Sequence, residues 1–227
     1  MRPSPMHYFP VSPAFMILLF VALAVVVAIV ELGVLTYAYE KMGISPRTIF
    51  AILLLSLFGS AINIPIAEMP AKDVVVQRTV NFMGVVYAVP EVEHRGHTII
   101  AANLGGAVIP TVLSVYLLIK NRIYLQAALG VLVMTGITHL LARPVPGVGI
   151  ALPTLVPPIL AAIVALVISR QHAAPLAYIA GSMGCLLGAD VLNLNHIWQL
   201  GAPIASIGGA GLSDGIFLTG IIAVLLA

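Results

Sequence analysis

Long apolar runs follow one another along nearly the whole 227-residue sequence, and they restrict the chain to a membrane environment. A helix needs roughly 20 apolar residues to cross about 30 Å of hydrocarbon. Charged residues make up only 8% of the chain, whereas they make up roughly a quarter of a soluble domain. The sequence therefore predicts an all-α integral membrane protein, with residues 1–227 forming a single membrane domain.

Seven of these runs have about the length of a membrane span. Their connections are short except for residues 67–96, which contain four of the eight acidic side chains. In that segment, β-branched residues on both sides of Gly84 are typical of two strands joined by a turn. We expect this segment to be an extramembrane β-hairpin at the membrane surface, inserted between the second and third spans. The predicted spans are residues 13–39, 46–66, 97–119, 123–141, 150–169, 174–194 and 204–226.

The charge balance argues against a nucleic-acid partner, because the formal net charge is only +2 and the chain has no basic cluster. Lys and Arg divide five against five between the two sides of the predicted membrane, so they do not set its orientation. The single cysteine, Cys185, lies in an apolar run, where we expect it to pack as a small side chain. No cofactor or metal is implied, since the one acidic and histidine-containing segment, "EVEHRGH", lacks the His-Glu-x-x-His pattern of zinc proteases.

Glycine and proline interrupt several predicted spans where a simple membrane anchor would contain Leu, Val and Ile throughout. Backbone groups freed by such breaks are tolerated at membrane depth only where protein or a water-filled cavity satisfies them. Glycine also allows helices to pack closely. Four interrupted segments in one chain favour an internal polar site over packing alone. They are "FGSAINIPIAEMP", "NLGGAVIPT", "GVGIALPTLVPP" and "SIGGAGLSDG".

Two of the three aspartates, Asp190 and Asp214, lie within the last two predicted spans. An aspartate at the bilayer centre costs roughly 2.5–3.5 kcal/mol on insertion scales, so two of them indicate a function. At about 1.5 Å per residue, each lies roughly 10–15 Å below the same interface. We therefore expect antiparallel neighbouring helices to hold the two carboxyls at similar depth, where they would share one proton.

A proton-sharing pair of this kind is the arrangement of an aspartic protease. Its ionised member takes a proton from water while its protonated member polarises the scissile carbonyl. Hydrolysis of a membrane-embedded peptide or protein by Asp190 and Asp214 is therefore the first functional hypothesis. We expect the glycines before Asp214 to open the backbone to an extended substrate and Pro153 to Leu155 to shape a groove. The residues expected to contact substrate or to form the motif are Gly208, Gly209, Gly211, Ser213, Pro153, Thr154 and Leu155.

Two resemblances bear on this hypothesis. The segment "GAGLSDGIF" resembles the Gly-x-Gly-Asp motif of the intramembrane aspartyl proteases, the group of presenilin, signal peptide peptidase and prepilin peptidase. This resemblance implies that Asp190 is the first catalytic aspartate and Asp214 the second, with Ser213 where those proteins have glycine.

The second resemblance covers almost the whole chain. "RPVPGVGIALPTLVPP", "GADVLNL" and "IGGAGLSDGIFLTGIIAVLLA" resemble an uncharacterised family of bacterial and archaeal multi-pass membrane proteins, known only as a domain of unknown function. It implies a multi-pass protein of a prokaryotic cell membrane and no particular activity.

Other functions fit the same residues. A secondary transporter or ion-coupled carrier would place Asp190 and Asp214 with Asn63 and Asn103 at helix breaks along a solute path. A non-catalytic membrane scaffold would instead use Asp214 as a helix N-cap and would leave no cavity beside it. In that case Asp190 would hydrogen-bond a nearby asparagine, either Asn193 or Asn195.

Two further features do not distinguish between these functions. Residues 211–215 match the Gly-x-Ser-x-Gly pattern around a nucleophilic serine, here Ser213, but the chain offers no strand-to-helix elbow and no suitably placed histidine. Glu31 is a single intramembrane carboxylate, either a member of a proton relay or a side chain that reaches the interface.

Overall fold

The computed structural model describes residues 13–70, 74–82, 85–93, 97–145, 149–194, 204–209 and 214–227. The chain divides into two compact units, Met1–Tyr37 and Ala38–Ala227. The described part of the first unit is helical and belongs to α1 (Pro13–Lys41), whose range nearly equals that of the first predicted span. The second unit holds the remaining helices and strands and the candidate site.

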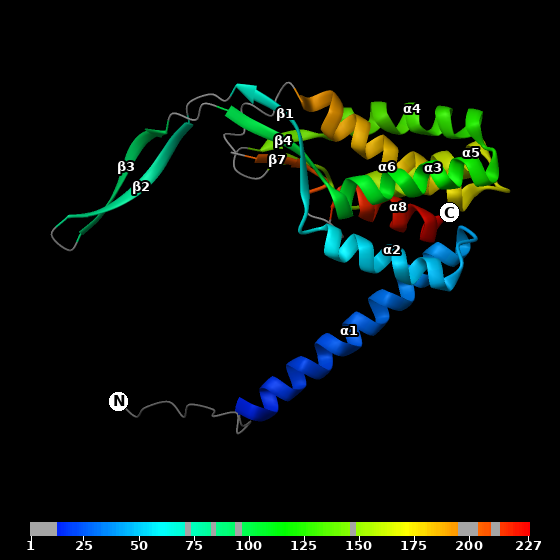
Figure 1. The fold of residues 1–227 in the computed structure, drawn as a ribbon, viewed down its shortest axis with the longest axis horizontal. Coiled ribbons are helices and arrows are strands. Elements are labelled where there is room, and N and C mark those ends of the chain that lie inside the picture. The colour runs from blue at the N-terminus through cyan, green and yellow to red at the C-terminus, as the bar shows by residue number, and fades with distance from the viewer. Residues whose placement is uncertain are drawn as a thin grey trace, which may run out of the picture. The chain divides into compact units, whose positions relative to one another are not determined.

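Helix α6 is the centre of the second unit, and four other described helices pack against it (Figure 1). Its sequence, "AAPLAYIAGSMGC", is rich in alanine and glycine, so neighbouring helices approach it closely, and all but one of its 13 residues are buried. The described helices of this unit are α2 (Pro46–Gly59), α3 (Ile109–Asn121), α4 (Tyr124–Leu141), α5 (Val156–Ile168), α6 (Ala173–Cys185) and α8 (Gly215–Leu226).

Glycines mark the places where α6 and its continuation touch α4. Gly184 packs against Met134, and Gly188 packs against the side chain of Thr138 and the carbonyl of Thr135. The Thr138 hydroxyl also donates a hydrogen bond to the Gly184 carbonyl at 2.7 Å. These contacts match the close-packing interpretation of glycine in membrane helices.

Two short π-helical turns in the described part of this unit extend its helices. The turn η1 (Leu104–Val108) precedes α3, while η2 (Leu186–Asp190) and the 3-10 turn η3 (Val191–Asn193) continue α6. With these additions, three described helices are long and apolar enough to cross a membrane: Leu104–Asn121, Tyr124–Leu141 and Ala173–Asn193. Shorter apolar helices cover Arg47–Gly59, Val156–Ile168 and Gly215–Leu226. The chain is thus a mostly helical protein with helices suited to a membrane.

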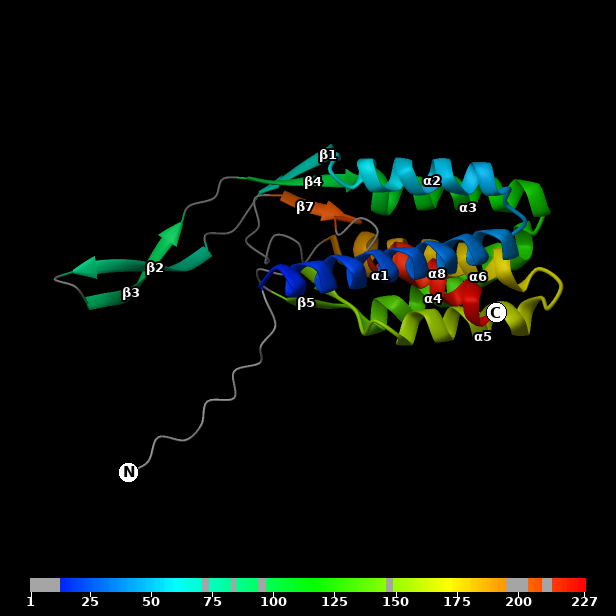
Figure 2. The ribbon, with the colours of Figure 1, turned by 90° about the horizontal axis from the view of Figure 1, so that it is seen from below.

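In the described ranges, three small sheets accompany the helices. The largest has the order β1-β4-β7, in which β1 (Asn63–Pro70) pairs antiparallel and β7 (Ile204–Ile207) parallel with β4 (His97–Asn103). Figure 2 shows this sheet at one end of the helices. β2 (Val74–Phe82) and β3 (Val85–Glu93) form an antiparallel pair, and so do β5 (Arg143–Val145) and β6 (Gly149–Ala151). That the β2–β3 hairpin lies outside the membrane stays a prediction.

The strands correct the ends of four predicted spans. Residues 63–66 belong to β1 and residues 97–103 to β4, although both were predicted to be helical. At the fifth and seventh spans, β6 and β7 occupy the predicted starts, and the helices begin only at Val156 and Gly215. These errors arise because the spans were predicted from hydropathy, and a short apolar run has the same hydropathy in a buried strand as in a helix.

The packing of Gly188 predicts a specific loss of stability. A methyl group at this position would meet the Thr138 hydroxyl and the Thr135 carbonyl, so Gly188→Ala should lower the free energy of unfolding by about 1–3 kcal/mol. Gly136→Ala is the matched control, because its added methyl would meet nothing within 4 Å and alanine favours the helix. Thermal unfolding in detergent measures both, and equal melting temperatures for the two variants would contradict the packing.

Candidate active site

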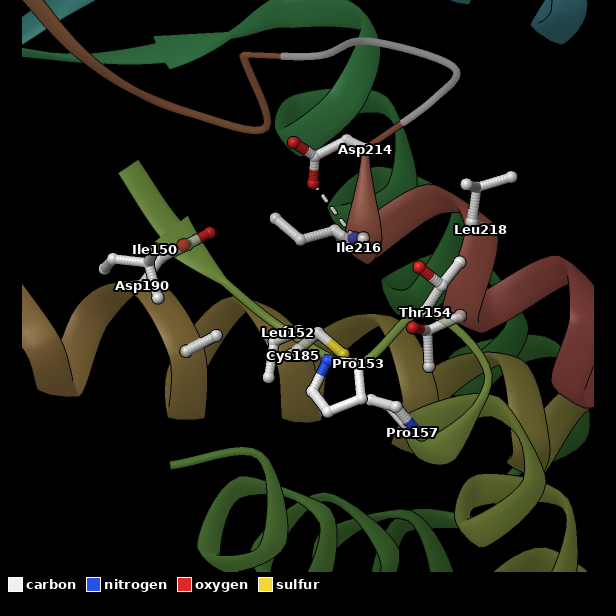
Figure 3. Close-up of a pocket in the computed structure, with 13 residues that line it drawn as sticks. Ile150, Leu152, Pro153, Thr154, Pro157, Cys185, Asp190, Asp214, Ile216 and Leu218 are labelled. Carbon is white, nitrogen blue, oxygen red and sulfur yellow. Dashed lines mark hydrogen bonds between the residues drawn. The ribbon is translucent and has the colours of Figure 1, made fainter. Parts of the chain in front are cut away.

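A cavity of about 210 Å³ lies where the end of α6, the start of α8 and the segment between β6 and α5 meet (Figure 3). Asp190 and Asp214 both line it, Asp190 from η2 and Asp214 from the residue before α8. The two carboxyls are close enough to interact electrostatically. The cavity therefore brings together the pair that the sequence singled out.

Asp190 is the last residue of the π-helical turn η2. A π-turn widens the helix by one residue and frees backbone carbonyls, and such turns occur often at functional sites. The side-chain amide of Asn193 donates hydrogen bonds to the Gly188 carbonyl at 3.0 Å and to the Ala189 carbonyl at 2.9 Å. Asn193 thus stabilises the turn, and no described residue donates a hydrogen bond to the Asp190 carboxyl.

Asp214 is the N-cap of α8. Its Oδ1 accepts a hydrogen bond from the Ile216 backbone N–H at 2.9 Å, and its backbone is extended with φ −70° and ψ 147°. The Ser182 hydroxyl of α6 donates a hydrogen bond to the Ile216 carbonyl at 3.2 Å, which ties the start of α8 to α6. The sequence offered helix capping as an alternative role for Asp214. In the structure, Asp214 both caps α8 and lines the cavity.

Sequence reasoning missed Cys185 as a residue of this cavity and assigned it only to packing. Its side chain is 1% exposed, lies beside the Thr219 hydroxyl and lines the cavity together with Ile216. Cys185 also forms a small apolar cluster with Ala107 and Ile216. Its position five residues before Asp190, on the helix that carries that aspartate, was the available signal.

The segment Pro153 to Leu155 divides between the cavity and the surface. Pro153 and Thr154 line the cavity, whereas Leu155 is 61% exposed and is not one of the lining residues. Short β6 leads directly into this segment, and Pro157 at the start of α5 also lines the cavity. Two of the three residues predicted to shape a groove therefore lie beside the aspartates.

The described glycines before Asp214, Gly208 and Gly209, lie in a different environment from the residues that line the cavity. Gly208 follows β7 with φ +70°, a left-handed conformation that favours glycine, and an added Cβ would come within 2.6 Å of the Gly106 carbonyl carbon and the Ala107 nitrogen. Gly209 packs against Ser206. Neither is among the described residues that line the cavity. Gly211 and Ser213 lie outside the described residues.

Asn63 and Asn103 form a separate hydrogen-bonded cluster. Asn103 accepts hydrogen bonds from the backbone N–H groups of Gly105 at 3.0 Å and Gly106 at 2.9 Å, so it caps η1. Its amide donates to Asn63 Oδ1 at 3.1 Å, and the Ser206 hydroxyl donates to the same oxygen at 2.6 Å. Neither asparagine is among the described residues that line the aspartate cavity.

The acidic and histidine-containing segment "EVEHRGH" is only partly described. Glu91 and Glu93 lie in β3 and His97 begins β4, while His94 lies outside the described residues. Within the described ranges, no group of three or more His, Cys, Asp or Glu side chains is placed to hold a metal ion.

The cap predicts how substitutions at Asp214 affect stability. Asp214→Ala removes the acceptor for the Ile216 N–H and should lower the free energy of unfolding by about 1 kcal/mol. Asp214→Asn keeps an oxygen acceptor, and asparagine caps helices about as well as aspartate, so its stability should stay within a few tenths of a kcal/mol. Denaturant unfolding in detergent tests both variants, and equal losses would contradict the capping geometry.

Comparison with known proteins identifies a family and no activity. No curated protein and no solved structure matches the chain. One family profile matches residues 57–226, a range that includes every residue of the cavity and both aspartates. The chain therefore belongs to the family described as "Protein of unknown function (DUF1614)".

Proposed function

We propose that this protein is an intramembrane aspartyl protease that hydrolyses peptide bonds in or near the bilayer. One observation carries the proposal: Asp190 and Asp214, from the ends of two different helices, line one cavity together with Pro153 and Thr154. Its volume of about 210 Å³ is far above the roughly 10–15 Å³ that one water molecule needs. A reacting water and part of a peptide therefore fit in it together.

The two carboxyls have different surroundings, which gives each a role. Asp214 accepts a backbone hydrogen bond at the N-terminus of α8, and both this bond and the helix dipole favour a negative charge. No described residue offers Asp190 a comparable donor. In the proposed resting state, Asp214 is therefore the ionised member and Asp190 carries the shared proton.

Hydrolysis then follows with protons and electrons balanced. The Asp214 carboxylate takes a proton from water as the water oxygen attacks the peptide carbonyl carbon, while Asp190 gives its proton to the carbonyl oxygen. When the tetrahedral intermediate collapses, the C–N bond breaks. The amine leaving group takes the proton from Asp214, and Asp190 recovers one from a hydroxyl of the intermediate. The pair returns to its starting state.

The membrane setting of the proposal is a multi-pass protein of a prokaryotic cell membrane with about seven spans. The three long apolar helices support membrane residence, and the shorter apolar helices are proposed to complete the bundle. The substrate is then a membrane-embedded peptide or protein. The polar cavity beside α6 would supply the water that hydrocarbon excludes.

The contacts favour the protease over the other hypotheses. A carrier was expected to group Asn63 and Asn103 with the aspartates, but Asn103 caps η1 and Asn63 accepts a hydrogen bond from the Ser206 hydroxyl. A scaffold was expected to leave no cavity beside a capping Asp214, but the cap occurs together with one.

Replacing either aspartate tests the function directly. Asp190→Asn and Asp214→Asn should each reduce cleavage of membrane-anchored peptides at least about a hundredfold, because acid–base groups typically contribute 10²–10⁴. Both amides are nearly isosteric with the carboxyls, so melting temperatures should stay close to that of the wild type. Quantitative mass spectrometry of peptide fragments from purified protein in nanodiscs is the measurement.

Two controls sharpen this experiment. Glu68→Gln removes an exposed carboxyl from β1 that is not a cavity residue, and Cys185→Ala removes the cavity thiol without touching the pair. Both variants should keep most of the activity. Unchanged cleavage by either aspartate variant would refute the dyad, and loss of cleavage with Cys185→Ala alone would point to thiol chemistry instead.

A further inference from the structure

A groove of about 550 Å³ lies between α2 and α3 and shares no described lining residue with the aspartate cavity. Figure 2 shows the two helices alongside each other. The end of α3 lies beside the start of α2, because Lys120 donates a hydrogen bond to the Gly43 carbonyl. The end of α2 lies beside η1, because Gly59 packs against Leu104. The helices that form the groove are therefore antiparallel.

The walls of the groove are apolar except at one end. Leu55 of α2 is 62% exposed and Val112 of α3 is 63% exposed, so the groove is open along its side. Among the described lining residues, only Thr48 and Tyr116 carry hydroxyl groups, and they lie near the start of α2 and the end of α3. The groove thus has an apolar body and one polar end.

Two cations lie at the polar end. The Lys120 ammonium is 5.5 Å from the centroid of the Tyr116 ring, and one of its three N–H donors bonds the Gly43 carbonyl. Arg47 is exposed and precedes Thr48 on α2. Neither cation forms an ion pair with a described residue. The polar end therefore carries two positive charges that no described carboxylate balances.

Other helix ends on the same side of the unit are also positively charged. The Lys41 ammonium donates a hydrogen bond to the Val224 carbonyl near the end of α8, which reaches this side as α3 does (Figure 1). Glu40 is the only acidic side chain described at these helix ends. The surroundings of the groove end therefore favour a negatively charged partner. The basic residues described on this side are Lys41, Arg47, Lys120, Arg122 and Arg170.

The length of the groove matches one leaflet of a bilayer. Its residues extend from Thr48 to Leu55 along α2, about 10 Å, and from Tyr116 back to Leu104 along η1 and α3, about 18 Å. One leaflet contains about 15 Å of hydrocarbon. Tyrosine is enriched at the membrane interface, so Tyr116 fits the level of the lipid headgroups. A single acyl chain that starts at this level would fill the groove.

We propose that the groove between α2 and α3 binds an anionic phospholipid. One acyl chain lies against Leu55 and Val112, and the headgroup phosphate accepts charge-assisted hydrogen bonds from Lys120 and Arg47. An apolar helix in the groove would instead leave both cations without a counter-charge. A zwitterionic lipid would supply the same chain but no net negative charge. The proposal concerns binding alone and is independent of the protease proposal.

Native mass spectrometry tests the headgroup preference. The full chain is released from nanodiscs of equal parts dioleoylphosphatidylglycerol and dioleoylphosphatidylcholine, and bound molecules of each lipid are counted. Phosphatidylglycerol should be retained about tenfold or more over phosphatidylcholine, because each basic residue near an anionic headgroup contributes roughly fivefold. Arg47→Gln combined with Lys120→Gln should remove this preference. Arg170→Gln is the matched control and should keep it, because Arg170 lies between α5 and α6, away from the groove.

A second pair of variants tests the groove itself. Leu55 and Leu57 are exposed leucines of α2, at 62% and 55%, and of the two only Leu55 lines the groove. Leu55→Trp should fill the groove and lower phosphatidylglycerol binding several-fold, whereas Leu57→Trp should bind it like the wild type. Equal retention of the two lipids, an equal loss with Arg170→Gln, or unchanged binding by Leu55→Trp would overturn the proposal. A lipid-free dimer in the same spectra would also overturn it, because a second copy would then cover the groove.

Discussion

The fold depends on hydrogen-bond partners for the backbone N–H and C=O groups in the places where its helices depart from α-geometry. In hydrocarbon every backbone N–H and C=O needs a partner from the protein or from trapped water. Two asparagine side chains supply such partners. Asn103 accepts from the first N–H groups of η1, and Asn193 donates to two carbonyls of η2. These hydrogen bonds stabilise the two π-turns, so irregular backbone can exist beside the central helix. Asp190 is the last residue of the second turn, η2.

The candidate site follows from this constraint and from close packing. Gly184 and Gly188 let α4 approach the end of α6, and the Ser182 hydroxyl ties the start of α8 to the same helix. Asp190 and Asp214 therefore face one cavity from two elements that are held together. Their surroundings differ, since one carboxyl is bonded at a helix N-terminus and the other lies at a π-turn. This difference gives the proposed protease an ionised and a protonated member.

Part of this arrangement could be predicted from the sequence, and the rest could not for physical reasons. Counting residues along the last two spans placed Asp190 and Asp214 at similar depth, and both line one cavity. Long shared motifs predicted that the chain belongs to an uncharacterised family, and the family match confirms this prediction. The β1-β4-β7 sheet was missed because its apolar strands have the hydropathy of helices. The roles of Asn103 and Asn193 depend on π-turns, which no residue pattern in this sequence indicates.

The central claim is that Asp190 and Asp214 titrate as one unit. Difference infrared spectroscopy of the protein in nanodiscs measures it, by following the C=O stretching band of protonated carboxyls against pH. The account predicts a band that is absent in Asp190→Asn and that titrates at a different pH once Asp214 is replaced by asparagine. An Asp190 band with the same titration midpoint in the wild type and in Asp214→Asn would contradict it, because the two carboxyls would then be independent.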